Sequence, residues 1–163
     1  MTTTATPRAR PDWPAQLRAH ALRVTRPRTH VLGAVHEHPH ASADQVHRVV
    51  RTALPEITVQ SVYVVLADLE RHDLVRRIDV PGSPARYETR TGDNHHHAQC
   101  VRCLRITDVD CVVGSAPCLH PGSAAGMTIL SADVLFRVIC ADCRENGPES
   151  TTAPASPPRS EHV

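Results

Sequence analysis

Four cysteines stand in two CxxC pairs, a spacing typical of a structural zinc site. The pairs are Cys100 with Cys103 and Cys140 with Cys143. Each pair supplies two thiolates from one tight turn, and together they complete the four sulfur ligands of a closed tetrahedral zinc ion. The alternative is a pair of redox-active or disulfide-forming dithiols, but two such pairs in one short domain favour zinc. We therefore expect one structural Zn(II) ion per subunit.

Three consecutive histidines, His95 to His97, lie just before the first CxxC pair. On a strand, His95 and His97 point to one face and His96 points to the other. Imidazoles combined with carboxylates suit Fe(II) or Mn(II) better than they suit a closed thiolate zinc site. The sequence thus predicts a second metal site of nitrogen and oxygen ligands beside the zinc.

The metal-ligand pattern argues against an enzyme. A catalytic zinc ion keeps an open coordination position, commonly beside a general base. Neither the HExxH pattern of metalloproteases nor the HxE and PCxxC pattern of deaminases occurs in the chain. A zinc-ribbon interaction module that does not bind DNA remains a separate alternative.

The positive charge lies in the first half of the chain. Residues 1–90 carry 13 Arg against 9 Asp and Glu, a balance of +4, whereas residues 91–163 carry 5 Arg against 8, a balance of −3. All 18 basic side chains are arginines, whose planar guanidinium suits phosphate and guanine edges. Charge alone indicates nucleic-acid binding only weakly, because solvated faces often carry such an imbalance.

Composition limits which residue types can form the core and which cellular compartment is expected. Aromatic residues make up 2% of the 163 residues, so the core must be built from Val, Leu, Ile and Ala. No apolar run approaches the roughly 20 residues that cross a bilayer, and the N-terminus has no apolar signal segment. We expect a cytoplasmic protein, since thiols stay free to bind metal in a reducing compartment.

Apolar spacing predicts four helices in the first half. The first covers Trp13 to Leu22, the second is capped by Thr25 with Pro27 in its first turn, the third starts near Ser42, and the fourth runs from Thr58 to about His72. A period of two then predicts a hairpin, residues 74–80 and 85–89, around the turn Pro81-Gly82-Ser83-Pro84. Helices followed by an arginine-bearing hairpin describe a winged helix-turn-helix, whose fourth helix enters the major groove.

Short strands are predicted beyond the hairpin at residues 97–101, 104–109 and 134–140, and residues 112–127 have room for only a turn or two of helix. The expected fold class is α+β, a winged-helix domain followed by a small α/β dimerisation domain with a structural zinc site. The expected divisions are a disordered tail 1–12, a DNA-binding domain 13–90, a metal-binding domain 91–145 and a disordered tail 146–163 rich in Pro, Ser and Thr.

Several motifs resemble the ferric uptake regulator family of metal-dependent repressors. They are LRVTRPR, HASADQV, TVQSVYVVLADLERHDLV and RYETRTGDNHHHAQCVRC, and the resemblance runs from about Leu17 to Cys143. It implies a homodimer that binds double-stranded operator DNA, with a regulatory Fe(II) or Mn(II) ion in each subunit. The regulatory ligands that it implies are His40, Glu88, His95, His97 and Asp108.

The resemblance also bears on what is sensed. The peroxide-responsive branch of the family tends to carry Asp at the position of Asp108, and the segment DVDCVVGSAPCL is similar to actinobacterial catalase-gene regulators. We therefore expect a peroxide sensor in which the oxidant attacks His40 or His95. An iron-, zinc- or nickel-responsive repressor of metal-uptake genes is the alternative.

Two further groups of residues are candidates for function. Cys111 and Cys118 lie outside the zinc pairs, and are either redox-active thiols or small buried apolar residues. The residues expected to contact DNA are Gln60, Ser61 and Tyr63 on the fourth helix, and Arg23, Arg26 and Arg28 around the second. Each arginine could instead be merely solvated. Val64 stands where many family members carry a polar residue.

Overall fold

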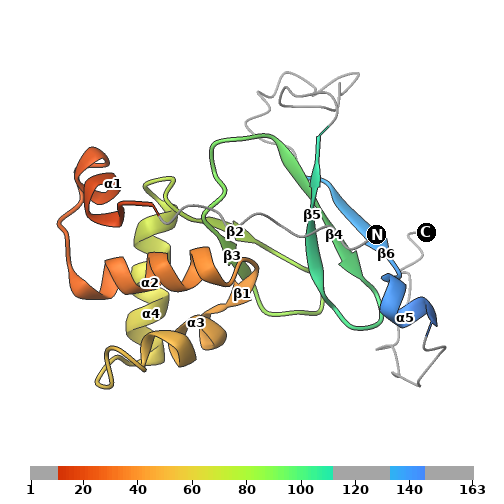
Figure 1. Cartoon of the computed structure of the whole chain (residues 1–163), viewed down its shortest axis with the longest axis horizontal. Helices are drawn as coiled ribbons and strands as arrows, with labels where there is room; N and C mark the ends of the chain where they lie inside the picture. The colour runs from red at the N-terminus through yellow and green to blue at the C-terminus, as the bar shows by residue number, and fades with distance from the viewer. Residues whose placement is uncertain (1–10, 112–132, 146–163) are drawn as a thin grey trace, which may run out of the picture. The chain divides into compact units, whose positions relative to one another are not determined.

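The computed structural model describes residues 11–111 and 133–145, which fall into two compact units (Figure 1). The units join between Asp93 and Asn94. The two predicted tails and the segment 112–127 lie almost entirely outside the described residues, so their structures stay predictions. No helix in the described parts of the chain is both long enough and apolar enough to span a membrane.

The helices of the first unit begin at capping residues that the sequence predicts. Thr25 accepts a hydrogen bond from the amide of Arg28, and Thr58 accepts one from the amide of Ser61. Ser42 forms a capping box with Gln45. Such caps satisfy amides that have no partner inside the helix. The helices are α1 (Trp13–Ala19), α2 (Arg26–Glu37), α3 (Ala43–Val50) and α4 (Val59–Glu70).

A small antiparallel sheet completes the first unit. Its order is β1 (Ala41–Ser42), β3 (Arg86–Glu88) and β2 (Arg76–Ile78). β2 and β3 form the predicted hairpin, in a register that pairs Arg76 with Glu88. Gly82 at the tip has φ of 72°, a left-handed conformation that glycine adopts without steric cost. The four helices and a wing of this kind confirm the winged helix-turn-helix.

The apolar core of the first unit is one cluster of aliphatic side chains with few aromatics, as the composition predicts. Leu17, Leu32, Leu66 and Leu69 are fully buried and come from α1, α2 and α4. Trp13 and Tyr87 are its aromatic members. Burying one leucine contributes about 1.5–3 kcal/mol, so these side chains fix the helix that carries the expected DNA contacts.

The second unit is a three-stranded sheet with a short helix. Its order is β5 (Ile106–Asp110), β4 (His95–Cys100) and β6 (Leu135–Val138), with β5 antiparallel and β6 parallel to β4. The helix is α5 (Ala141–Glu145). The three predicted strands are confirmed, and so is the α+β class.

The structure differs from the predicted elements in three places. α1 ends at Ala19, before Leu22, because the chain turns through Ala21 with φ of 56°. β1 and α5 were not predicted. A two-residue strand exists only through its pairing with β3, and a five-residue helix is too short to show an apolar period.

Candidate metal centres and DNA-binding face

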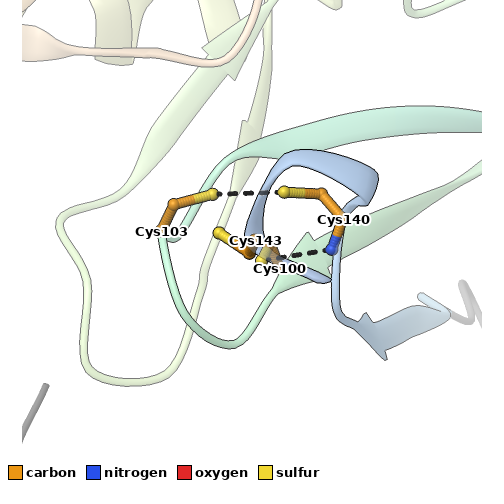
Figure 2. Close-up of side chains that lie close together, drawn as sticks. All are labelled: Cys100, Cys103, Cys140 and Cys143. Atoms are coloured by element: carbon orange, nitrogen blue, oxygen red, sulfur yellow. Dashed lines mark hydrogen bonds between the residues drawn. The ribbon is translucent and has the colours of Figure 1, made fainter. Parts of the chain in front are cut away.

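The four cysteines of the two CxxC pairs form one cluster, here called the cysteine cluster (Figure 2). Cys100 ends β4, and Cys103 lies in the turn toward β5. In that turn Leu104 has φ of 59° and donates its amide to the carbonyl of Cys100. Cys140 precedes α5, and Cys143 lies on it. Two tight turns therefore present the four thiols to one another.

The spacing of the sulfur atoms fits a tetrahedral zinc ion. All four lie within 4.8 Å of one another, and the Sγ atoms of Cys103 and Cys140 are 3.7 Å apart. A zinc ion with bonds of about 2.3 Å places its sulfur ligands about 3.8 Å apart. A disulfide requires about 2.05 Å, and the described cysteines are free thiols. This geometry favours zinc over the disulfide alternative.

Hydrogen bonds shift the acidity of two of these thiols in opposite directions. The backbone at Cys103 and then at Cys140 lowers the pKa of Cys100 to about 6. The amide of Cys140 lies 3.4 Å from the Cys100 sulfur (Figure 2). The pKa of Cys143 is raised to about 12, and the largest cause is its hydrogen bond with the Cys140 side chain. The surroundings of the Cys100 sulfur thus favour its thiolate form, whereas the surroundings of the Cys143 sulfur disfavour one.

Two arginines brace the turns around the cysteine cluster. Arg102 donates to the carbonyl of Cys143 at 2.5 Å, across 41 residues of sequence. Arg105 pairs with Asp142 at 2.8 Å, which raises the pKa of the guanidinium. These contacts tie the first CxxC pair to the second. Sequence reasoning missed both, because no local pattern shows which distant residue an arginine will meet.

In the first unit, His40 and Glu88 form an imidazole–carboxylate pair, here called the N-terminal pair. Nε2 of His40 lies 3.4 Å from Oε2 of Glu88, which is 1% exposed. His40 precedes β1 and donates its amide to the carbonyl of Tyr87 at 2.8 Å. Its φ of 63° is a left-handed conformation that costs a residue with a side chain about 1–2 kcal/mol. The backbone therefore holds this imidazole beside Glu88 at the expense of strain.

In the second unit, His97 and Asp108 form a similar pair, here called the C-terminal pair. They are opposite each other in the β4–β5 register, and Nε2 of His97 lies 3.9 Å from Oδ1 of Asp108. The rings of His95 and His97 meet edge to face, with their centroids 4.9 Å apart. The ring centroid of His96 instead lies 6.0 Å from that of Phe136. The predicted separation of His96 from the other two histidines thus agrees with the structure. Imidazole nitrogens and carboxylate oxygens in both pairs are ligand types that fit Fe(II) or Mn(II).

The expected DNA-contact residues differ in how free their side chains are. Gln60 and Tyr63 are exposed on the first turns of α4, with Tyr63 at 42%. The hydroxyl of Ser61 lies 2.8 Å from that of Thr58 at the helix cap. Arg23 is exposed, and Arg26 approaches the carbonyl of Ala53 at 3.4 Å.

Arg28 has a structural partner that the sequence does not reveal. Its Nε donates to Asp68 at 3.0 Å, and its Nη1 donates to the carbonyl of Arg23 at 2.7 Å. The pair connects the start of α2 to α4.

Of the two cysteines outside the cluster, Cys111 is a half-buried thiol after β5, and Cys118 lies outside the described residues. Their redox role stays a prediction.

Comparisons with known proteins match most of the chain. A model of the ferric uptake regulator family matches residues 19–112. The transcriptional regulator FurA of Mycobacterium tuberculosis is 50% identical over 133 residues, 82% of this chain and 90% of the relative. Ferric uptake regulation protein 1 of Mycolicibacterium fortuitum is 52% identical over 125 residues, 77% of this chain and 78% of the relative. The Helicobacter pylori ferric uptake regulator has a similar fold, with a TM-score of 0.62 at 20% identity over 83% of this chain and 90% of that one.

Proposed function

The chain belongs to the ferric uptake regulator family, and from that membership and its two imidazole–carboxylate pairs we propose that it is an iron-responsive repressor. It is a metal-responsive transcriptional regulator and not an enzyme. In this proposal a homodimer binds double-stranded operator DNA when Fe(II), or Mn(II) in its place, occupies a regulatory site in each subunit. One structural zinc ion per subunit occupies the cysteine cluster.

One observation carries the proposal: each unit presents its own imidazole beside its own carboxylate. Neither pair alone supplies enough ligands for a six-coordinate ion. We propose that one ion joins the N-terminal pair to the C-terminal pair, with His95 as the fifth ligand. Occupancy would then fix how the DNA-binding unit is held, and a ligand shifts such an equilibrium by its greater affinity for one arrangement.

Iron is favoured over peroxide as the signal. The relative from Mycolicibacterium fortuitum carries ferric uptake regulation in its name, which reverses the order of preference drawn from Asp108. Peroxide sensing stays the second candidate because His97 is buried opposite Asp108 and in edge-to-face contact with His95. An oxidant produced at an iron ion there would meet an imidazole first.

We propose that α4 reads the operator through its exposed first turns. Gln60 and Tyr63 have exposed side chains, and Val64, at 59% exposure, offers an apolar contact of the kind that suits a thymine methyl group. Arg23 and Arg26 would contact phosphate. Arg28 is left out of this set because its guanidinium already binds Asp68 and the carbonyl of Arg23.

A gel-shift experiment on the full-length, zinc-loaded protein tests the proposal. The operator is first selected from a random duplex library in the presence of Mn(II). The shift of that operator is then measured anaerobically with Fe(II), Mn(II), Zn(II) or Ni(II). We expect Fe(II) and Mn(II) to tighten binding at least ten-fold and His40→Ala to abolish this gain, since the change removes a ligand.

The control is His38→Ala, which removes an exposed imidazole two residues away and should keep the response. Metal-independent binding, or an intact response in His40→Ala, would contradict the proposal. Adding peroxide to the Fe(II) complex separates the two signals. Retained DNA supports iron sensing, whereas release with a mass gain of one oxygen on a peptide holding His40 or His95 supports peroxide sensing.

A further inference from the structure

Glu88 is shared between an imidazole and a guanidinium. Its Oε2 faces Nε2 of His40 at 3.4 Å, and its Oε1 faces Nη1 of Arg76 at 3.7 Å. The carboxylate is 1% exposed, while the arginine side chain keeps 32% of its surface in solvent. The proposed regulatory site therefore contains a buried carboxylate with a guanidinium facing one of its oxygens.

The hairpin register places Arg76 there. Arg76 is directly opposite Glu88 in the antiparallel β2–β3 pair, and residues opposite each other share a face of the sheet. Arg77, the next residue, is opposite Tyr87 on the other face and pairs with the exposed Asp79 at 2.8 Å. The two neighbouring arginines thus carry the same charge in different surroundings.

We propose that Arg76 sets the metal affinity of the regulatory site by competing with the metal ion for the charge of Glu88. A buried carboxylate is costly without a cation, and Arg76 supplies one in the metal-free protein. A metal ion brings two further positive charges to the same carboxylate, where they repel the guanidinium. Arg76 therefore stabilises the metal-free state and raises the concentration of ion needed to fill the site. This inference rests on the proposed function, in which Glu88 is a metal ligand.

Mn(II) binding to the full-length, zinc-loaded protein tests the inference. Free Mn(II) is measured by electron paramagnetic resonance in titrations of the wild type, Arg76→Gln, Arg76→Lys, Arg77→Gln and His40→Ala. Thermal unfolding of each protein is recorded with and without Mn(II). The Arg77→Gln protein is the matched control, because it loses the same charge from the same strand.

We expect Arg76→Gln to bind Mn(II) more tightly by on the order of ten-fold, a typical size for coupling between two sites. Its metal-free form should unfold at a lower temperature, and Mn(II) should restore more of that stability than it adds to the wild type. Arg76→Lys should stay near the wild type because it keeps the charge, and Arg77→Gln should bind Mn(II) unchanged.

Two patterns overturn the inference, and they differ in what else they overturn. Unchanged or weaker Mn(II) binding by Arg76→Gln, with binding lost in His40→Ala, rejects the competition by Arg76 and leaves the proposed site intact. Equal binding by the wild type and His40→Ala rejects the proposed site and the role of Arg76 with it. If Arg76→Gln fails to fold, Arg76→Lys with clearly altered Mn(II) affinity also overturns the inference.

Discussion

The N-terminal unit buries leucines and valines, whereas the described part of the C-terminal unit buries three histidines, a glutamine and a cysteine. All members of the apolar cluster lie between Trp13 and Tyr87. In the C-terminal unit, the apolar side chains Phe136, Val138 and Ile139 are exposed. Hydrophobic burial is the main source of stability in ordinary domains, and the described residues of the second unit hold little of it.

The cysteine cluster offers this unit a source of stability other than apolar burial. Its four sulfurs join the turn after β4 to the start of α5, two segments about 40 residues apart in sequence. Where a metal site does not exist in the unfolded chain, the free energy of metal binding becomes free energy of folding. The comparison indicates that the first unit is stabilised by apolar packing, and it predicts that the second unit is stabilised by zinc.

Removing zinc should give the largest effect and test that division directly. We expect a strong chelator, or Cys103→Ser, to unfold the second unit, since structural zinc contributes about 10–16 kcal/mol in small zinc domains. The single tryptophan, Trp13, lies in the core of the first unit, so its fluorescence should stay that of a folded protein. Amide hydrogen exchange should show lost protection in β4, β5 and β6.

Cys111→Ser is the control for that experiment, because Cys111 lies outside the cysteine cluster. It should keep its zinc and its protection pattern. A second unit that stays folded without zinc, or a Trp13 signal that changes together with the strands, would break the comparison.

The sequence predicts local features of both units well. Thr25, Ser42 and Thr58 cap helices because a hydroxyl before an apolar period is a signal within one turn of chain. The CxxC spacing likewise predicts the cysteine cluster. Each CxxC pair forms within one tight turn, and the cluster then requires only that the two turns come together. The helix caps and each CxxC turn depend on neighbours in sequence, and so they can be predicted from it.

Contacts between distant residues account for what the sequence does not reveal. Arg28 looked like a phosphate contact, yet its partner Asp68 is 40 residues away. No sequence pattern indicates a partner for Arg76, because its position beside Glu88 depends on the hairpin register. Arginine has several possible partners, and the fold alone decides which one it meets.

A core substitution should give the next largest effect, confined to the first unit. Leu32 is fully buried on α2, and Leu32→Ala should lower the free energy of unfolding of that unit by about 2–5 kcal/mol through lost transfer energy and a cavity. Denaturant titration followed by Trp13 fluorescence measures the loss. Zinc content and the protection of β4 should not change, and a loss of either would show that the units do not fold independently.

The smallest expected effects on stability come from breaking two ion pairs, one in each unit, and the two effects should differ in size. Arg28 and Asp68 are 21% and 18% exposed, whereas Arg105 and Asp142 are 59% and 61% exposed. Asp68→Asn should cost about 1.5–3 kcal/mol, because it weakens charged hydrogen bonds that join α2 to α4. Asp142→Asn should cost about 0–1 kcal/mol, as exposed pairs do.

The measurement is again denaturant unfolding, followed by Trp13 fluorescence for Asp68→Asn and by hydrogen exchange of β4 for Asp142→Asn, both at fixed zinc. Added salt should shrink the Asp142 effect further and leave most of the Asp68 effect, because partly buried charges are screened less. Equal costs for the two changes would mean that Asp142 helps to hold the cysteine cluster together. The second unit would then depend on its ionic braces as well as on its metal.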